Sequence, residues 1–250
     1  MEGAKNELKD LALVINGMLD RIELSYNSQK QFVSDASHEL RTPIAVIQGY
    51  VGMLERWGKT DKAVLDEGIS AISQEAASMK ELVERLLFLA RHDKKTLMLE
   101  MEVFDPLEVM SEVHREARLL SPAHRFELNP AQNARISADK GMIKQLMRIL
   151  VDNAIKYTES GSICVGVQLY ELFARVDVTD TGIGIAEAEQ PKIFSRFYRS
   201  QAVCEEEGVG IGLYLARKII SDQGGYIKLH SEVGIGSTFS VFLPRSAQIL

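Results

Sequence analysis

The stretch FVSDASHELRTPIAVIQGYVGMLE, from Phe32 to Glu55, sets the architecture of the first part of the chain. Its apolar spacing predicts one helix, yet Pro43 lies in the interior of that helix. A proline there removes a backbone donor, presses on the carbonyl of Glu39 and costs about 3 kcal/mol. The sequence therefore predicts a kinked helix, with the kink one turn past His38.

The helical pattern extends on both sides of this stretch, over about the first 95 residues. A heptad seam precedes the stretch and continues in weaker form through Ser25, Gln29, Phe32 and Ala36, and the apolar set resumes after Pro43. A further seam follows the turn WGKTD, with Gly58 as helix stop and Thr60 or Asp61 as the next cap. The three seams are Leu8, Leu11, Ile15, Met18 and Ile22; Ile44, Ile47, Val51 and Leu54; and Leu65, Ile69, Ile72, Ala76, Met79, Val83, Leu86 and Ala90.

Two long helices joined by a short turn form an antiparallel hairpin. One hairpin buries its two apolar stripes poorly, whereas two hairpins bury them as a four-helix bundle. We therefore expect a homodimer. A monomeric hairpin packed on the rest of the chain is the alternative.

Past Lys94 the apolar period changes and strands alternate with helices. The pattern predicts a multi-domain protein, an all-α hairpin followed by an α+β sandwich with one mostly antiparallel sheet covered by helices. A hinge is expected near residues 93–104. Helices are expected at Leu107–Leu120, Lys140–Tyr157, Glu187–Phe194 and Ile211–Gln223, and strands at Arg125–Leu128, Ala134–Ser137, Ser162–Leu169, Phe173–Thr179, Tyr226–His230 and Thr238–Leu243.

Composition narrows the function classes. The 250 residues carry a net charge of −6, which gives no reason to expect nucleic-acid binding. The two cysteines, Cys164 and Cys204, suit a reducing compartment. No apolar run reaches the length of a membrane span, which leaves open that the chain is the soluble piece of a membrane protein.

Three glycine clusters in the second half point to a nucleotide. DTGIGI (180–185) ends a strand, GVGIGL (208–213) opens a helix and GIGSTF (234–239) enters a strand. Amides at a helix start bind phosphates, and a strand-end carboxylate such as Asp180 can accept a hydrogen bond from the exocyclic amine of adenine. In DNAIKYT, Asn153 and Lys156 share one helix face, where an amide and an ammonium suit a metal and a phosphate.

Other nucleotide sites do not fit the sequence. The P-loop pattern GxxxxGK[ST] is absent, and the clusters do not follow the first strand of a βαβ unit as in a Rossmann site. The signatures of Ser/Thr/Tyr kinases are missing as well.

Together these motifs resemble those of bacterial sensor histidine kinases of two-component systems. SHELRTP (37–43) is similar to the phosphoacceptor box, DNAIKYT to the N box, DTGIGI and GVGIGL to the two glycine boxes, and FSRFYR (194–199) to the F box. The resemblance implies three segments: 1–24 as the last helix of a HAMP signalling module, 25–97 as the dimerisation and phosphotransfer domain, and 98–250 as a GHKL (Bergerat-type) ATP-binding domain.

The resemblance also implies the site residues. It makes His38 the phosphoacceptor and Arg199 a phosphate-facing arginine, with ATP and Mg²⁺ as cofactors and Asn153 as the metal ligand. The segment from Tyr198 to Val209 corresponds to a mobile lid. The implied nucleotide-binding positions are Asn153, Lys156, Tyr157, Asp180, Gly182, Gly184, Gly208, Gly210, Gly212, Leu213 and Thr238.

The residues around His38 suit a phosphoryl transfer. The imidazole offers one nitrogen to phosphorus, while the other nitrogen sheds its proton to a base, for which Glu39 is the neighbour. Thr42 lies one turn further, where the family holds the water that hydrolyses the regulator's phosphoaspartate. Pro43 is expected to loosen the helix so that the bundle can switch between kinase and phosphatase geometry. His92, His114, His124 and His230 lie in no motif and receive no role.

These observations predict an ATP-dependent histidine kinase that phosphorylates its own His38 and passes the group to an aspartate of a cognate response regulator. The resemblance implies the cytoplasmic portion of a membrane-bound parent whose sensor lies outside this chain. One departure from the N box of the family favours alternative functions: Ile149 stands four positions before Asn153, where the family commonly has a polar residue. The alternatives are a phosphatase-dominant or kinase-weak sensor, and a GHKL ATPase or scaffold.

Overall fold

The computed structural model describes residues 2–93, 99–129, 135–200 and 210–245. The chain divides into two compact units, Met1–Ala90 and Arg91–Leu250. The predicted limit at 97/98 falls at residues 94–98, which lie outside the described part, and the limit at 24/25 stays a prediction.

The first unit is a helical hairpin, as the seams predicted. Helix α1 (Glu2–Trp57) and helix α2 (Lys62–Asp93) are joined by a turn. Gly58 ends α1, and a Cβ there would lie 2.7 Å from the Leu54 carbonyl oxygen, so a larger residue would not fit. Of the two candidate caps it is Asp61 that caps α2, because its Oδ1 accepts from Ala63 N at 2.9 Å and from Val64 N at 3.3 Å.

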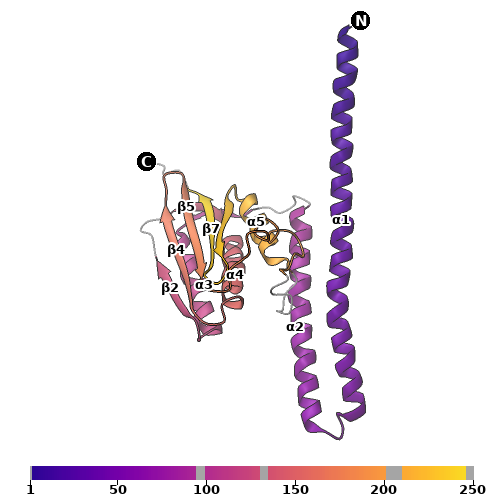
Figure 1. Cartoon of the computed structure of the whole chain (residues 1–250), viewed down its shortest axis with the longest axis vertical. Coiled ribbons are helices and arrows are strands. Elements are labelled where there is room, and N and C mark those ends of the chain that lie inside the picture. The colour runs from indigo at the N-terminus through magenta and orange to yellow at the C-terminus, as the bar shows by residue number, and fades with distance from the viewer. Residues whose placement is uncertain (1, 94–98, 130–134, 201–209, 246–250) are drawn as a thin grey trace. The chain divides into compact units, whose positions relative to one another are not determined.

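Helix α1 continues through Pro43 without interruption, and Figure 1 shows it as one continuous helix. Pro43 itself is buried within the hairpin. The predicted kink therefore does not break the helix, and the switching role of Pro43 stays a prediction.

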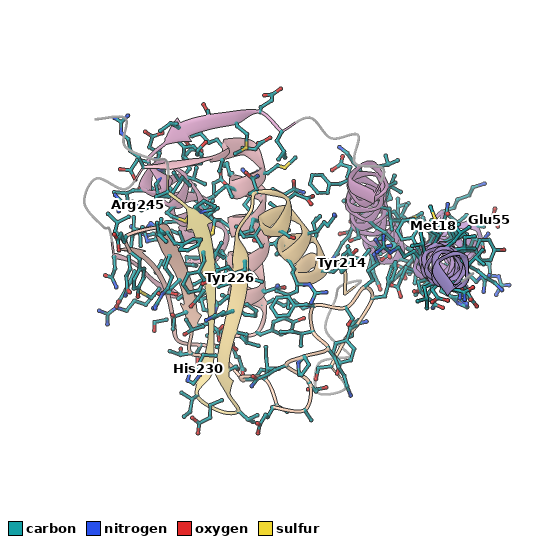
Figure 2. All side chains as sticks on the ribbon, turned by 90° about the horizontal axis from the view of Figure 1, so that it is seen from above. Met18, Glu55, Tyr214, Tyr226, His230 and Arg245 are labelled. Atoms are coloured by element: carbon teal, nitrogen blue, oxygen red, sulfur yellow. The ribbon has the colours of Figure 1, made fainter. Side chains whose placement is uncertain are left out.

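The apolar stripes of the hairpin remain largely uncovered in a single chain. Met18, labelled on α1 in Figure 2, is 60% exposed, and residues of both helices are similarly open. These residues include Leu11, Ile15, Ile22, Ile44, Val51, Leu65, Ile69 and Val83. A hairpin with this much exposed apolar surface matches the expectation that another hairpin covers it.

The second unit is the predicted α+β sandwich. Its elements are β1 (Met101–Phe104), α3 (Pro106–Leu120), β2 (Arg125–Asn129), β3 (Ile136–Asp139), α4 (Lys140–Lys156), β4 (Ser162–Leu169), β5 (Phe173–Asp180), α5 (Gly212–Asp222), β6 (Tyr226–Glu232) and β7 (Gly236–Pro244). The five-stranded sheet has the order β2-β4-β5-β7-β6, in which only β2 and β4 run parallel. Strands β1 and β3 form a separate two-stranded sheet, which the sequence did not predict.

Helices α3, α4 and α5 cover one face of the five-stranded sheet (Figure 1). The core lies between them, where Ile143, Leu146, Leu150, Leu215, Ile219, Val176 and Val241 are fully buried. The hydrophobic period of 3.6 in α4 and of 2 in β5 brings these residues to the same interface.

The helix predicted at Glu187–Phe194 is absent, and a series of turns takes its place. Pro191 has no N–H to donate to a helical ladder. Gln190 instead donates to the carbonyls of Ile185 and Ser231, at 3.1 and 3.0 Å, and Phe194 packs on Phe239. Tertiary contacts therefore override the local helix pattern. Of the strand predicted at Ala134–Ser137, Ala134 lies outside the described residues, and the strand observed is Ile136–Asp139. Asp139 ends that strand and caps α4 by accepting from Met142 N.

Candidate functional site

The site is built around Asp180, the last residue of β5. Its side chain is only 7% exposed, and its Oδ1 accepts from Gly182 N at 2.9 Å and from Ser237 N at 3.2 Å. Burial raises the pKa of the Asp180 carboxyl above its ordinary value, and the two backbone N–H groups offset part of that rise. The strand end therefore presents an acceptor whose orientation is fixed before any ligand arrives.

The loop after Asp180 lies tightly against the end of α4. A Cβ on Gly182 would lie 2.1 Å from the Tyr157 carbonyl oxygen, which also accepts from Ile183 N at 3.1 Å. Gly184 has φ +70°, and its Cβ would lie 2.0 Å from the Glu232 carbonyl oxygen. The structure shows that these glycines let backbone approach backbone, and their expected contact with a ligand stays a prediction.

The turn between β6 and β7 holds the other side of this loop. Gly234 N donates to the Ile183 carbonyl and Ser231 Oγ accepts from Ile185 N, both at 2.8 Å. A Cβ on Gly236 would lie 2.0 Å from the Asp180 carbonyl oxygen, so this position also requires glycine. The Asp180 loop is therefore held from two sides by backbone contacts.

Ser237, not the predicted Thr238, lies beside Asp180. In the antiparallel register Asp180 pairs with Ser237, whereas Thr238 pairs with Thr179 and its hydroxyl lies 3.1 Å from that of Thr179. Successive strand residues point to opposite faces, so Thr238 belongs to the other face of the sheet. Ser237 is therefore a further candidate from GIGSTF, which strand alternation counted back from Phe239 could have indicated, and the role of Thr238 stays a prediction.

The last turn of α4 and the start of α5 carry the remaining predicted residues of the candidate nucleotide site. Asn153 and Lys156 lie in that turn and Tyr157 caps it, with the Lys156 ammonium 5.2 Å from the centre of the Tyr157 ring. Helix α5 begins at Gly212, and Ile211 before it provides no side-chain cap. Ile211 thus leaves the first N–H groups of α5 without a cap from its own side chain, and N–H groups at a helix start can bind a phosphate.

Ile149 packs between α4 and the start of α5. It is 8% exposed, and its Cγ2 lies 3.3 Å from the position of a Cβ on Gly212. The isoleucine that replaces a polar residue in this motif is thus a packing residue between α4 and the start of α5. Gly210 has φ +71°, and its Cβ would lie 2.6 Å from the Tyr198 carbonyl oxygen, while Leu213 is half-buried. Gly208 lies outside the described residues.

The segment FSRFYR is anchored by its first aromatic residue. Phe194 is buried edge-on against Phe239, with ring centroids 6.4 Å apart, and the Arg217 guanidinium lies 5.6 Å from its ring. Phe197 has a φ of 57°, which is uncommon for a residue with a side chain. Arg199 is exposed at the end of this segment. Residues 201–209 of the predicted lid lie outside the described part of the chain.

The predicted phosphoacceptor His38 lies on α1 in the first unit, together with Glu39 and Thr42. His38 and Thr42 are both exposed and one turn apart, while Glu39 is half-buried. This arrangement gives an imidazole that an incoming phosphoryl group can reach, with a hydroxyl on the same helix face.

The described residues contain no group of three or more His, Cys, Asp or Glu side chains that could hold a metal. The prediction that Asn153 holds Mg²⁺ therefore calls for phosphate and water oxygens as the remaining ligands, and it stays a prediction. This donor set suits Mg²⁺, which keeps several waters and binds through few protein ligands.

The comparisons with known proteins identify both units. Residues 28–95 match the family model described as His Kinase A (phospho-acceptor) domain. Residues 138–247 match the model described as Histidine kinase-, DNA gyrase B-, and HSP90-like ATPase. The chain belongs to the sensor histidine kinase family, and the resemblance inferred from its motifs is confirmed.

Among its relatives is the signal transduction histidine-protein kinase ArlS of Staphylococcus aureus, which is 40% identical over 240 residues. That match covers 94% of this chain and 53% of the relative, so the chain spans about half the length of the curated relatives it matches. The histidine kinase AdeS of Acinetobacter baumannii has a similar structure, with a TM-score of 0.67 and 25% identity over 84% of this chain and 98% of that one.

A second solved structure holds histidine kinase ThkA together with its response regulator protein TrrA. It aligns with a TM-score of 0.72 and 26% identity over 88% of this chain and 63% of that one. The predicted order of a helical phosphoacceptor domain followed by an ATPase domain is therefore confirmed. None of the helices in the described part has the apolar run that crossing a bilayer needs.

Proposed function

We propose that the chain is an ATP-dependent protein-histidine kinase core that phosphorylates its own His38. The observation that carries this proposal is the exposed His38 beside Glu39 in the same chain as the preformed Asp180 site. In the proposed step one imidazole nitrogen bonds to the γ-phosphorus, the bond from that phosphorus to the β-phosphate oxygen breaks, and ADP leaves. The other imidazole nitrogen gives its proton to the Glu39 carboxylate.

In this proposal the nucleotide binds to the Asp180 loop, the end of α4 and the start of α5. The Asp180 carboxylate accepts from the exocyclic amine of adenine, and the uncapped start of α5 with Gly210 and Gly212 faces the phosphates. Lys156 and Arg199 supply positive charge, with Tyr157 beside them. Mg²⁺, held by Asn153, would neutralise phosphate charge when bound.

The phosphoryl group then passes to an aspartate of a response regulator. Support comes from the family and from ThkA, whose structure holds a response regulator. We also propose that the chain acts as a homodimer, because the exposed stripes of α1 and α2 suit a four-helix bundle. We place the two units on the cytoplasmic side of a membrane-bound sensor, following the resemblance of the first stretch to a HAMP helix.

A second candidate is a sensor in which phosphatase activity dominates. Two observations favour it: the apolar Ile149 packs where the family motif often has a polar residue, and Thr42 is exposed one turn from His38. Kinase and phosphatase activity can coexist in one protein, and Ile149 would shift the balance between them toward the phosphatase. A plain GHKL ATPase is less suited, because it has no need of His38 and its neighbours.

Incubation with γ-labelled ATP separates these functions. We expect label on the protein that is labile in acid and stable in alkali, as a phosphoramidate is. Release of labelled phosphate without protein label would instead support the ATPase. Loss of label from a phosphorylated regulator, without net labelling of the protein, would support the phosphatase-dominant sensor.

A further inference from the structure

His124 lies in the turn between α3 and β2, and no motif includes it. Both of its ring nitrogens nevertheless have partners. Nδ1 lies 2.6 Å from Ser121 Oγ, and Nε2 contacts the Thr158 carbonyl oxygen. A carbonyl oxygen only accepts, so Nε2 carries the proton and Nδ1 accepts from the Ser121 hydroxyl. The Thr158 carbonyl thus fixes the tautomer, and the Ser121 hydroxyl holds the ring by donating to Nδ1.

Thr158 follows the end of α4, where backbone carbonyls lack helical partners. Thr158 is 1% exposed, so its backbone is buried in the fold. A buried carbonyl that loses its donor costs free energy. His124 therefore anchors the backbone at the end of α4 to the turn before β2.

The same end of α4 supports the Asp180 loop. The Tyr157 carbonyl accepts from Ile183 N at 3.1 Å. A Cβ on Gly182 would lie 2.1 Å from that carbonyl oxygen and 2.8 Å from Thr158 Oγ1. Gly182 N in turn holds Asp180 Oδ1 at 2.9 Å. A short series of contacts thus runs from His124 through Thr158 and Gly182 to Asp180.

We propose that His124 is a positioning residue of the nucleotide site. His124 does not contact the nucleotide in this proposal. It fixes the position of the backbone at the end of α4, against which the Asp180 loop packs. Loss of its hydrogen bond lets residues 157–158 shift, so the loop and the Asp180 carboxylate lose their fixed place. The inference rests on the proposed role of Asp180 in binding adenine.

The chain offers a matched control in His114. Both histidines pack edge-on against Phe126, with ring centroids 6.1 Å away for His114 and 6.2 Å for His124. The buried Nε2 of His114 has no hydrogen-bond partner among the described residues. His114→Leu therefore removes a similar ring contact without removing a bond to α4.

The test compares His124→Leu, His124→Gln and His114→Leu in the full chain. We measure the dissociation constant for ADP and the hydrogen exchange of the Ile183 amide. His124→Leu is expected to weaken ADP binding about fivefold, the effect of one net hydrogen bond, and to speed Ile183 exchange. His124→Gln keeps a donor for the Thr158 carbonyl and should recover most of both values. His114→Leu should change neither.

Equal ADP affinity and equal Ile183 exchange in His124→Leu and His114→Leu would overturn the proposal. If His124→Leu does not fold, Ser121→Ala decides. Without the serine hydroxyl the imidazole loses the hydrogen bond that holds its Nδ1 side, so the same two changes are expected at smaller size, and their absence refutes the role. Amide exchange needs no nucleotide, so it tests positioning even if the wild-type chain fails to bind ADP, a failure that would refute the proposed function instead.

Discussion

The hairpin and the sheet unit differ in where their apolar and functional side chains lie. In the sheet unit, α4 buries Ile143, Leu146 and Leu150 completely, whereas Met18 and Ile69 of the hairpin are more than half exposed. The functional residues differ in the same way, since His38 is exposed and Asp180 is buried. The sheet unit completes its own core and fixes the Asp180 carboxylate by two backbone hydrogen bonds. The hairpin presents His38 on helices whose apolar stripes are uncovered, which suits the proposed phosphoacceptor role.

The largest expected effect separates the two units directly. His38→Gln should abolish protein labelling by γ-labelled ATP, because glutamine has no nucleophilic nitrogen. ADP affinity should stay unchanged, since the nucleotide residues lie in the other unit. Labelling that persists in the variant would show that another residue is the acceptor. A parallel loss of ADP binding would contradict the assignment of the acceptor and the nucleotide site to separate units.

A second large effect is confined to the hairpin. Thr42→Ala should keep autophosphorylation and lose most dephosphorylation of the partner regulator, because the exposed hydroxyl lies one turn from His38. Thr42→Ser retains the hydroxyl and serves as the control. A regulator that loses its phosphate at the same rate with all three proteins would make Thr42 merely structural.

Asp180→Asn tests the rigid site. We expect ATP and ADP to bind more weakly by ~1.5–3 kcal/mol, the range for hydrogen bonds to charged groups. Guanine nucleotides should not suffer equally, and isothermal titration with both bases checks this. An equal loss for the two bases would mean that Asp180 supports the loop without reading the base.

The same carboxylate gives a pH dependence whose sign is fixed. Because burial raises the pKa of Asp180 in the fold, the folded state holds its proton at a pH where the unfolded chain has released it. The ligand-free unit therefore loses stability as pH rises from about 4 through that pKa, and Asp180→Asn should remove this loss. Adenine binding needs the charged form, so ADP affinity should fall as pH is lowered through the same window. Melting curves of wild type and variant, with and without ADP, would show both trends.

Glycine substitutions test how tightly the loop is held. Gly182→Ala puts a methyl group 2.1 Å from the Tyr157 carbonyl oxygen and should destabilise the fold by about 1–3 kcal/mol while weakening ADP binding. Gly234 has φ +80° but open space around it, so Gly234→Ala should cost only the left-handed backbone penalty of about 1–2 kcal/mol and leave ADP affinity nearly intact. Similar ADP affinities for the two variants would show that the contact with α4 does not shape the site.

The hairpin was predictable from sequence more fully than the site. Heptad seams and the turn at Gly58 and Asp61 are local signals, and both helices followed them. Most strands were also found, since period-2 alternation over β4 and β5 is strong. The helix expected at Glu187–Phe194 failed because long-range contacts of Gln190 and Phe194 decide that segment.

Within the candidate site, the motifs pointed to Asp180 and the glycines but not to the residues that contact them. Ser237 beside Asp180 depends on strand register, and the bond from His124 to Thr158 joins residues 34 positions apart. The use of Gly182 and Gly184 for contacts between backbones was equally invisible, because it depends on which chain segments meet. Local patterns name the residue types that a site needs, and only the packed structure shows which of them meet.

The smallest expected effect concerns Ile149. It lies one turn before Asn153, so an asparagine in its place could reach the metal or a metal-bound water. We expect Ile149→Asn to lower the Mg²⁺ concentration for half-maximal autophosphorylation modestly, since one neutral ligand contributes on the order of 1 kcal/mol. The structure adds a cost: Ile149 is 8% exposed and packs at Gly212, and a buried asparagine without partners costs about 1–3 kcal/mol.

Melting curves with and without ATP and Mg²⁺ separate the two effects. Ile149→Val is the packing control, because it loses a methylene for about 0.5–1.5 kcal/mol and adds no polar atom. A folded Ile149→Asn variant that melts lower without ligand, yet needs less Mg²⁺ than Ile149→Val, would show that the isoleucine gives up a metal contact in exchange for the packing of α4 on α5. If its Mg²⁺ dependence matches that of Ile149→Val, the isoleucine is only a packing residue, and the case for a weak kinase loses its main support.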